Sequence, residues 1–478
     1  MIKKSIRKNY IYNLIQQILL MIVPLITTPY LSRVLGADGI GTVSYAESVS
    51  AYFVLFAALG LNLFGQREIS YVQDNKEKRS IVFWETFILQ CITSFAVIIG
   101  YIIFSLRQAN PCLYFVLVFN LLSVTVNVAW FFQGIEEFSK IVSRNIIFKI
   151  INVIYIFLVV KSDVDLIYYL FGLTFFAFLG DVSLWLYLPR YIGLPKWQDL
   201  RPMRHLRVVF SLFVPVIAIK VYTVLDKVMI GVITKDAFEN GYYEQAFKIA
   251  KLTQTIVTAL GTVMIPRIGY EFENGNTDEV RRLMYRGYKF VWFLGIPLSL
   301  GLICISANLV PWFYGDNYQK VVPLLNILSF FAVIIGISNV TGNQYLIPTK
   351  QQNIFTVSVA IGAVTNFLLN LILIKRFQSI GAAIASVVAE MVVMTVQLYF
   401  VRKELNPTVI VKSGSPYYIA GAVMTGVLYS IKQLVEPSIG NTFFLILCGM
   451  AVYGCVLLLM RDEFLLSLLN VVLRKQRE

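Results

Sequence analysis

Residues 208–258 read VVFSLFVPVIAIKVYTVLDKVMIGVITKDAFENGYYEQAFKIAKLTQTIVT. The apolar runs at 208–233 and 241–264 are each long enough to cross a bilayer, for which a helix needs about 20 apolar residues. They nevertheless contain charged residues: Lys220, Asp226, Lys227, Glu244, Lys248 and Lys251. A charge near the bilayer centre costs about 2.5–3.5 kcal/mol on insertion scales, so we do not expect these side chains to face lipid.

The charged residues recur on single helix faces. Lys220 and Lys227 are two helical turns apart and share a face. In the second helix, a polar stripe with spacing i, i+4, i+7, i+11 and i+14 comprises Glu244, Lys248, Lys251, Thr255 and Thr258. Two cationic faces in adjacent helices predict a wet, cationic cavity. The alternative is that the lysines reach to the membrane interface or pair with Asp226 and Glu244.

The composition is that of an integral membrane protein. Of the 478 residues, 58% are hydrophobic and 14% are charged, whereas soluble domains have roughly 25% charged residues. The net charge of +14 does not indicate a nucleic-acid partner, because that requires a basic patch on a soluble face. The five cysteines are scattered in or beside apolar segments, without the spacing of a metal site or a disulfide framework.

Fourteen apolar segments predict an all-α protein with about fourteen transmembrane helices. They lie at 11–32, 43–64, 82–105, 112–132, 145–160, 166–188, 208–233, 241–264, 288–307, 321–343, 354–374, 380–400, 416–433 and 441–460. Of the 41 Lys and Arg residues, 28 fall in the loops and tails on the side of the termini and 8 in the opposite loops. This asymmetry predicts that both termini are cytoplasmic.

The two halves of the chain repeat. Residues 41–46 (GTVSYA) and, about 200 residues later, residues 241–246 (GYYEQA) each open an apolar segment. Six helices per unit is an even number, so both units enter the membrane the same way and form a parallel repeat, with substrate expected between them. We expect an N-lobe at 1–200, a C-lobe at 201–404, and two extra helices with a cytoplasmic tail at 405–478.

The segment at 145–160 carries a second polar stripe. Asn145, Lys149 and Asn152 are spaced i, i+4 and i+7 and share a face. We interpret Lys149 as a cavity residue, whereas asparagines in spans also form hydrogen bonds between helices, so both interpretations stay open for Asn145 and Asn152. Some acids at or within spans are candidates either to carry a coupling cation or to neutralise a nearby lysine: Glu47, Glu85, Asp181 and Glu390.

The sequence has no motif of an enzyme. Residues 36–41 (GADGIG) lack the Lys and Ser/Thr of a P-loop and are interpreted as a tight turn. The single histidine, His205, lies in a basic loop. Because the predicted loops are short, we also expect no soluble catalytic domain. We therefore expect a transporter, not an enzyme, without a cofactor or a metal site.

Several stretches resemble a known family. They are PLITTPYLSRVLGADGIGTVSYAES at 24–48, LDKVMIG at 225–231, GYYEQAFKI at 241–249, LVPWFYGDNYQKVVPLLNIL at 309–328 and NFLLNLILIKRFQSIGAAIASVVAE at 366–390. In this order they resemble Wzx-like oligosaccharide and polysaccharide flippases, a branch of the multidrug/oligosaccharidyl-lipid/polysaccharide exporter superfamily. The resemblance covers nearly the whole chain and includes no catalytic motif. It implies two six-helix lobes around a central cavity that opens alternately to either side.

The resemblance also implies a substrate. This is an undecaprenyl-diphosphate-linked oligosaccharide, moved from the inner to the outer leaflet of the bacterial cytoplasmic membrane for capsule, O-antigen or related polysaccharide synthesis. A lysine 4 Å from a phosphate gains about 4 kcal/mol at an effective dielectric constant of 20, which exceeds its insertion cost. The residues expected to bind the diphosphate are Lys149, Lys220, Lys227, Lys248 and Lys251. Those expected to bind sugar are Asn145, Asn152, Gln245 and Thr255.

Transport without an ATP site requires another energy source. Asp226 and Glu244 lie beside the lysines and are candidates to exchange H⁺ or Na⁺. Expected partners besides the substrate are membrane lipids, a polysaccharide polymerase and glycosyltransferases. Two alternatives in the same superfamily stay open: a peptidoglycan lipid precursor flippase, which the lysines would suit equally, and a multidrug/cation antiporter, for which an acidic cavity would be expected.

Overall fold

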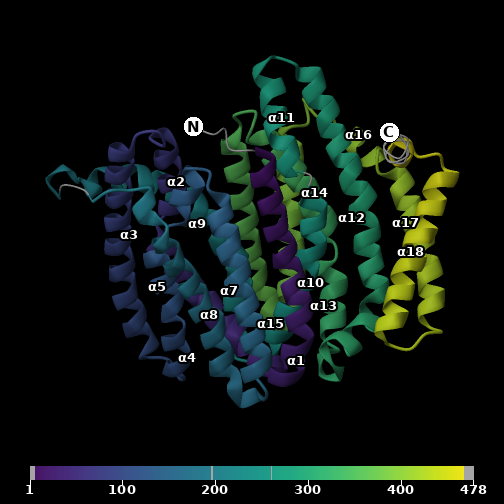
Figure 1. Ribbon diagram of the computed structural model, residues 1–478. Helices are drawn as coiled ribbons and strands as arrows, with labels where there is room; N and C mark the ends of the chain where they lie inside the picture. The colour runs from purple at the N-terminus through teal and green to yellow at the C-terminus, as the bar shows by residue number, and fades with distance from the viewer. Residues whose placement is uncertain (1–5, 195–196, 260, 468–478) are drawn as a thin grey trace. The chain divides into compact units, whose positions relative to one another are not determined.

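The computed structural model describes residues 6–194, 197–259 and 261–467, and all regular secondary structure in these ranges is helical (Figure 1). Each of the fourteen predicted segments falls on one or more of the helices. Within the described ranges, nine segments are long and apolar enough to cross a membrane by themselves. The prediction of an all-α membrane protein with about fourteen spans is confirmed.

The chain divides into two compact units, Met1–Val228 and Met229–Glu478. The helices of the first unit are α1 (Ile6–Ala58), α2 (Leu61–Tyr71), α3 (Lys76–Ser105), α4 (Pro111–Val116), α5 (Val118–Val126), α6 (Ala129–Gly134), α7 (Phe138–Val159), α8 (Leu166–Ser183) and most of α9 (Leu206–Thr234). The boundary between the units lies within α9. The predicted lobe boundaries at residues 200 and 404 stay a prediction.

The second unit has a similar order of elements. Its helices are α10 (Ala237–Thr258), α11 (Gly261–Glu273), α12 (Thr277–Tyr314), α13 (Val321–Leu328), α14 (Phe331–Asn339), a π-helix (Val340–Leu346), α15 (Gln352–Phe400), α16 (Pro407–Lys412), α17 (Ser415–Lys432) and α18 (Ile439–Leu459). The two last helices pack on each other and on α12 (Figure 1).

Two long helices each comprise a pair of predicted spans joined without a loop. In α1 the junction is Gly36, with φ 68° and ψ 175°, a conformation that glycine adopts at little cost. In α15 the junction is Gln378, with φ 53°. The predicted turn at 36–41 is therefore a kink at its first residue.

The ends of the helices repeat at an offset of 200 residues. Helix α1 ends at Ala58 and α10 ends at Thr258, and a short helix begins at Leu61 in one case and at Gly261 in the other. In the first unit the junction contains Gly60, with φ 74°, against which the backbone of Phe213 packs. The repeated sequence segments thus give the same succession of long and short helices.

The fourth predicted span is interrupted. The apolar run at 112–132 forms α4, α5 and α6, and the break between the last two lies at Asn127. The backbone of Asn127 is extended, with ψ 119°, and its side-chain Oδ1 accepts a hydrogen bond of 3.0 Å from the backbone N–H of Ala129. An asparagine side chain that bonds to nearby backbone competes with the helical pattern, which accounts for the break.

The segment before α9 is fastened to α3. Glu85 of α3 is fully buried, and its carboxylate accepts a hydrogen bond of 2.7 Å from the backbone N–H of Arg201. It also contacts the Arg204 guanidinium at 2.6 Å and His205 Nε2 at 2.8 Å. The one histidine of the chain and a buried acid of a span therefore hold the start of α9 in place.

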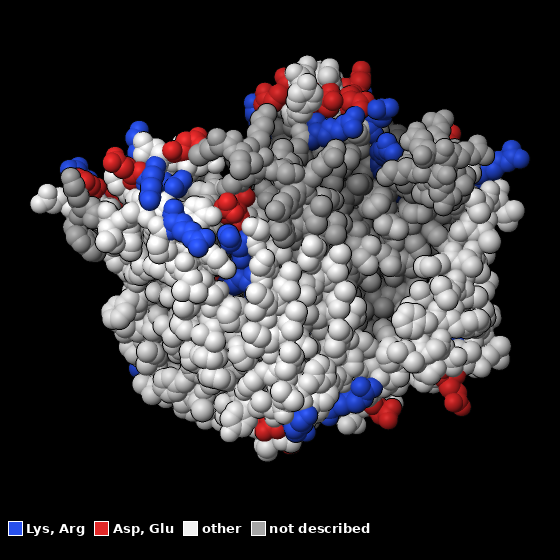
Figure 2. All heavy atoms as spheres, viewed as in Figure 1, with Lys and Arg blue, Asp and Glu red and all other residues white. Residues whose placement is uncertain are grey.

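On the face shown in Figure 2, most Lys, Arg, Asp and Glu residues lie toward one end or the other of the helices, and broad areas between them carry no charged side chain. Large apolar side chains of the long helices are exposed, among them Phe95 of α3, Leu158 of α7 and Leu447 of α18. Exposed apolar groups of this kind match the hydrocarbon core of a bilayer. The protein is a multi-pass membrane protein.

Candidate functional site

A cavity of about 240 Å³ lies within the first unit, between α7, α8 and the first part of α1. Its lining residues are Leu19, Arg144, Asn145, Phe148, Lys149, Asn152, Leu173, Phe176, Ala177 and Gly180. Two cationic and two amide side chains therefore come from one helix, α7, and the facing wall from α8 is apolar. A site with one charged face and one apolar face suits an amphiphilic ligand.

The structure brings together the polar stripe predicted on this helix. Asn145, Lys149 and Asn152 all line the cavity. Asn152 is only 5% exposed, and its Oδ1 has no hydrogen-bond partner among the described residues. Lys149 is half-buried and interacts electrostatically with Glu47 of α1. The cavity thus offers the positive charge of Lys149 and the unused acceptor of Asn152 within one helical turn.

Glycines of α8 allow it to approach α7 closely. A Cβ at position 180 would lie 3.2 Å from Cδ of Arg144, and a Cβ at position 172 would lie 2.3 Å from the ring of Tyr155. The second position has no room for a side chain, and the first has little. Because Gly172 and Gly180 have no Cβ atom, the side chains of Tyr155 and Arg144 in α7 can pack directly against the backbone of α8.

Arg144 is a cavity residue that sequence reasoning missed, because it was assigned to the loop ahead of the span at 145–160. Helix α7 begins at Phe138, so Arg144 lies well inside it. Its Nη1 donates to Oδ1 of Asp181 in α8 at 2.6 Å, and the two side chains are 11% and 8% exposed. The only signal in the sequence was an arginine directly before one apolar segment and an aspartate within the next, which does not by itself predict a pair.

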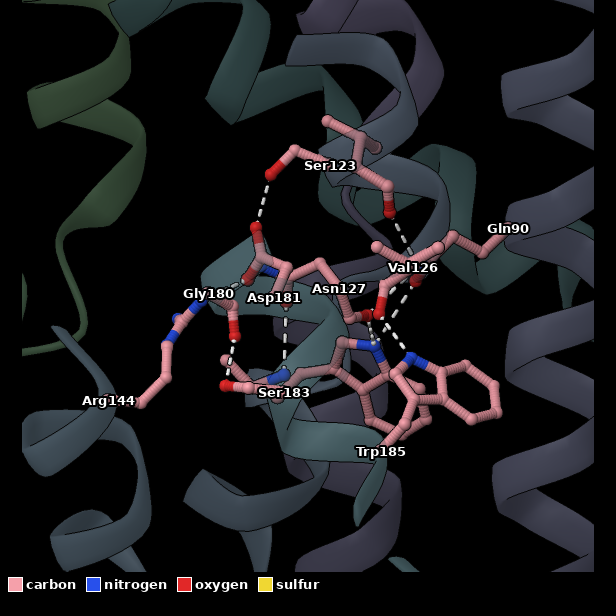
Figure 3. A network of polar contacts seen from close by, with 12 residues as sticks. Gln90, Ser123, Val126, Asn127, Arg144, Gly180, Asp181, Ser183 and Trp185 are labelled. Atoms are coloured by element: carbon pink, nitrogen blue, oxygen red, sulfur yellow. Dashed lines mark hydrogen bonds and ion pairs between the residues drawn. The ribbon is translucent and has the colours of Figure 1, made fainter. Parts of the chain in front are cut away.

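Asp181 of α8 connects α7, α5 and the break between α5 and α6 (Figure 3). Besides Arg144, its carboxylate accepts hydrogen bonds from the Ser123 hydroxyl in α5 and, at 2.9 Å, from Nδ2 of Asn127 at the break before α6. A buried carboxylate with three donors is well compensated for the loss of water. Asp181 therefore fixes both the guanidinium of Arg144 and the helix break.

The backbone carbonyls at this break are occupied by side chains. Nε2 of Gln90 donates to the carbonyls of residues 124, 125 and 127 at 2.6, 3.0 and 2.9 Å. The indole of Trp185 donates to the carbonyl of residue 126 at 2.8 Å, and that of Trp130 donates to the carbonyl of residue 127 at 3.0 Å (Figure 3). The cavity residue Arg144 is thus supported by a rigid hydrogen-bonded layer.

The residues predicted on α9 occupy different environments. The side chain of Lys220 lies outside the described residues. Asp226 is buried, at 8% exposed, and interacts electrostatically with Tyr52 of α1. Lys227, one residue further along, is half-buried. The first unit thus contains both acids and cations at the depth of its spans.

The stripe predicted on α10 belongs to the second unit. Lys248 pairs with Glu244 at 3.5 Å, with side chains 34% and 14% exposed. Lys251 is exposed, and Thr255 bonds to its backbone carbonyl at 2.8 Å. Gln245, in contrast, has a fully buried side chain, and its backbone carbonyl accepts a hydrogen bond of 2.9 Å from the Tyr314 hydroxyl. Gln245 therefore points into the packed side of α10 and the other four residues do not.

Comparison with known proteins shows which families and relatives the chain matches. The model of the family described as "Polysaccharide biosynthesis protein" matches residues 6–270, and that described as "MatE" matches residues 212–372. The chain is 25% identical over 407 residues to the "Putative O-antigen transporter" of Escherichia coli K12, covering 84% of this chain and 97% of that one. It is 22% identical over 239 residues to the "Probable low-salt glycan biosynthesis flippase Agl15" of Haloferax volcanii, covering 50% of each.

Solved structures share the fold. A structure titled "Lipid II flippase MurJ, inward closed conformation" superposes with a TM-score of 0.76 at 17% identity, covering 95% of this chain and 99% of that one. The relatives are named as transporters and flippases, so the prediction that the chain is not an enzyme is confirmed. The resemblance inferred from the sequence is confirmed as well. Because the family model covers more than half of the chain, the protein belongs to the polysaccharide biosynthesis protein family.

Proposed function

We propose that the protein is a flippase for lipid-linked polysaccharide precursors. The observation that carries this proposal is the cavity of the first unit, in which the cations Arg144 and Lys149 face an apolar wall within membrane-spanning helices. Arg144 is paired with Asp181 and Lys149 interacts with Glu47, yet both cations still line a cavity whose facing wall is apolar. An amphiphile with an anionic head group and an apolar tail has the required chemistry. The names of the relatives, O-antigen transporter and glycan flippase, agree with such a ligand.

In its finer form, the substrate is an undecaprenyl-diphosphate-linked oligosaccharide, moved from the inner to the outer leaflet by alternating access. The diphosphate binds the lysines, which act as compact point charges, and the sugars bind the amides and hydroxyls of the polar stripes. Glycosyltransferases would supply this substrate and a polymerase would consume it. A cavity lined by Arg144 and Lys149 offers no attraction to a cationic drug, which makes a multidrug antiporter the weaker alternative.

The lysines of α9 and α10 give a test of this function. We expect the double variant Lys220→Ala/Lys248→Ala to insert normally but to lose most surface polysaccharide, because two head-group cations are removed. The measurement is surface glycan in a strain that lacks the native gene and expresses the variant. The matched control is Lys375→Ala/Arg376→Ala, which removes two exposed charges from α15. Normal glycan export by the Lys220/Lys248 variant would exclude these lysines as the diphosphate site.

Energy coupling gives a second test. We propose that Asp226 and Glu244 exchange H⁺ or Na⁺ during transport, since one is buried and the other is paired with Lys248. The variant Asp226→Asn/Glu244→Gln should therefore lose its dependence on an imposed ion gradient in proteoliposomes that contain a fluorescent lipid-linked sugar. Asp163→Asn, an exposed acid ahead of α8, is the control. Full transport with full ion dependence in the double amide variant would contradict the coupling role.

A further inference from the structure

We propose that the cavity between α7 and α8 is a binding site for a lipid phosphate that carries neighbouring hydroxyl groups, with Arg144 as its anion-binding residue and Asp181 as the residue that positions Arg144. The inference rests on the proposed function and extends it to a particular subsite and ligand chemistry. Neither residue was among the head-group residues expected from the sequence. The argument depends on which polar atoms of the cavity already have partners.

Arg144 has hydrogen-bonding capacity to spare. Its Nη1 is bound to Asp181 at 2.6 Å, while its Nε is buried without a partner among the described residues. A guanidinium has five N–H donors in a fixed planar arrangement that matches the oxygens of a phosphate. With Nη1 held by a carboxylate, the orientation of the remaining donors is fixed before a ligand arrives. A phosphate is the ligand group that supplies several strong acceptors together.

Asn152, in contrast to Arg144, requires a hydrogen-bond donor. Its Oδ1 is an acceptor, it lines the cavity, and the side chain is 95% buried without a donor among the residues described. A phosphate oxygen cannot satisfy it, whereas a hydroxyl group can. Arg144 and Asn152 are eight residues apart, so their Cα atoms are about 12 Å apart along the helix axis. A phosphate joined to one sugar, or to a glycerol, supplies acceptor oxygens for Arg144 and hydroxyl donors for Asn152.

The size and walls of the cavity limit the rest of the ligand. A volume of about 240 Å³ is below the roughly 300–1,000 Å³ of pockets that enclose drug-sized molecules. The site therefore holds one phosphate and one adjoining polyol, and further sugars lie outside it. Phe148, Leu173 and Phe176 line the same cavity and provide an apolar surface for the first carbons of the lipid chain. Lys149 adds a second positive charge.

Asp181 makes this arrangement stable when no ligand is present. A single buried arginine would be costly, but the pair with Asp181 compensates its charge. Ser123 and Asn127 hold the carboxylate from the other side, so it does not turn into the cavity to occupy the Nε of Arg144 (Figure 3). Besides joining α7 to α8 through Asp181, Arg144 lines the cavity.

Binding measurements on the full-length protein in phosphatidylcholine nanodiscs test the proposal. The probes are undecaprenyl-diphosphate-linked N-acetylglucosamine, undecaprenyl diphosphate and phosphatidylglycerol, each quantified by native mass spectrometry. Because Arg144→Gln alone leaves Asp181 unpaired, the decisive variant is Arg144→Gln/Asp181→Asn, which removes both charges. We expect it to bind the phosphate probes about 10- to 100-fold more weakly, the range for loss of a charge-assisted hydrogen bond. Lys161→Gln, just beyond the C-terminal end of α7, should bind as the wild type does.

Asn152→Ala separates the two halves of the ligand. It should weaken binding of the sugar-bearing probe by about 3- to 10-fold, as expected for one hydrogen bond, and leave undecaprenyl diphosphate unchanged. Arg144-dependent binding that favours the sugar-bearing probe supports the proposal and identifies the ligand as the transported substrate. Equal, Arg144-dependent binding of phosphatidylglycerol also supports it and identifies a resident phospholipid.

Two other outcomes are distinguishable. Wild-type affinity for every probe in the Arg144→Gln/Asp181→Asn variant would overturn the proposed site and would leave the flippase function standing. Wild-type protein that binds no lipid-linked sugar, but binds phosphatidylglycerol through Arg144, would support the phosphate site and contradict the proposed function instead.

Discussion

Replacing Asp181 by alanine is expected to lower the free energy of unfolding by about 3–5 kcal/mol, the cost of leaving one partner of a buried ion pair uncompensated. The variant leaves the guanidinium of Arg144 without its anion and removes an acceptor from Ser123 and Asn127. The measurement is the thermal unfolding midpoint of the purified protein in detergent, followed by the loss of the monodisperse peak in size-exclusion chromatography.

The matched control is Asp278→Ala at the start of α12. Asp278 also pairs with an arginine, at 3.2 Å, but its side chain is 94% exposed. An exposed pair contributes about 0–1 kcal/mol, so the control should unfold close to the wild type. If Asp181→Ala and Asp278→Ala unfold at the same temperature, the buried network does not stabilise the first unit. The combination Arg144→Gln/Asp181→Asn should recover part of the loss, because no charge then stays unpaired.

The second large effect is expected for Lys149→Glu, which should abolish glycan export. The substitution replaces an attraction to phosphate of about 4 kcal/mol, at 4 Å and an effective dielectric constant of 20, by a repulsion of the same size. Surface polysaccharide should fall below about one-tenth of the wild-type level, and lipid-linked precursor should accumulate in the cytoplasmic leaflet. Both quantities are measured in a strain that depends on the variant.

Lys149→Glu also places a second acid near Glu47, so protein folding requires its own control. Lys149→Gln keeps the length and polarity of the side chain without its charge, and we expect it to retain an intermediate level of export. Amounts of inserted protein should be compared for all three forms. Normal export by correctly inserted Lys149→Glu would show that this cation does not contact the anionic head group.

Local periodicity was sufficient to predict part of the cavity. Asn145, Lys149 and Asn152 share a face in any α-helix, so their common position followed from their spacing. Hydropathy likewise located the fourteen spans, because each must be apolar over about 20 residues. The glycine-rich segment at 36–41 correctly indicated an interruption of the helix. The interruption lies at Gly36, which is the only residue of the segment with a positive φ.

Tertiary pairing was not predictable in the same way. The contact between Arg144 and Asp181 joins residues 37 positions apart in different helices, and no local rule links them. The start of α7 was placed too late because residues 138–144 are partly polar, although a helix continues beyond its apolar stretch. The break at Asn127 was missed because no Gly or Pro marks it within the predicted span at 112–132. Gln245 and Glu244 are neighbours in sequence, but only the structure distinguishes the packed face from the other.

The hydrogen bonds to the carbonyls at the break between α5 and α6 bear on the leakage of protons across the membrane. Backbone groups released by a bend at membrane depth ordinarily attract water, and a file of water molecules conducts protons. Here Gln90, Trp130 and Trp185 take up four successive carbonyls. Each of these carbonyls therefore already has a side-chain donor. With side-chain donors on these carbonyls, a carrier that admits a bulky amphiphile can bend a helix without opening a path for protons along the electrochemical gradient.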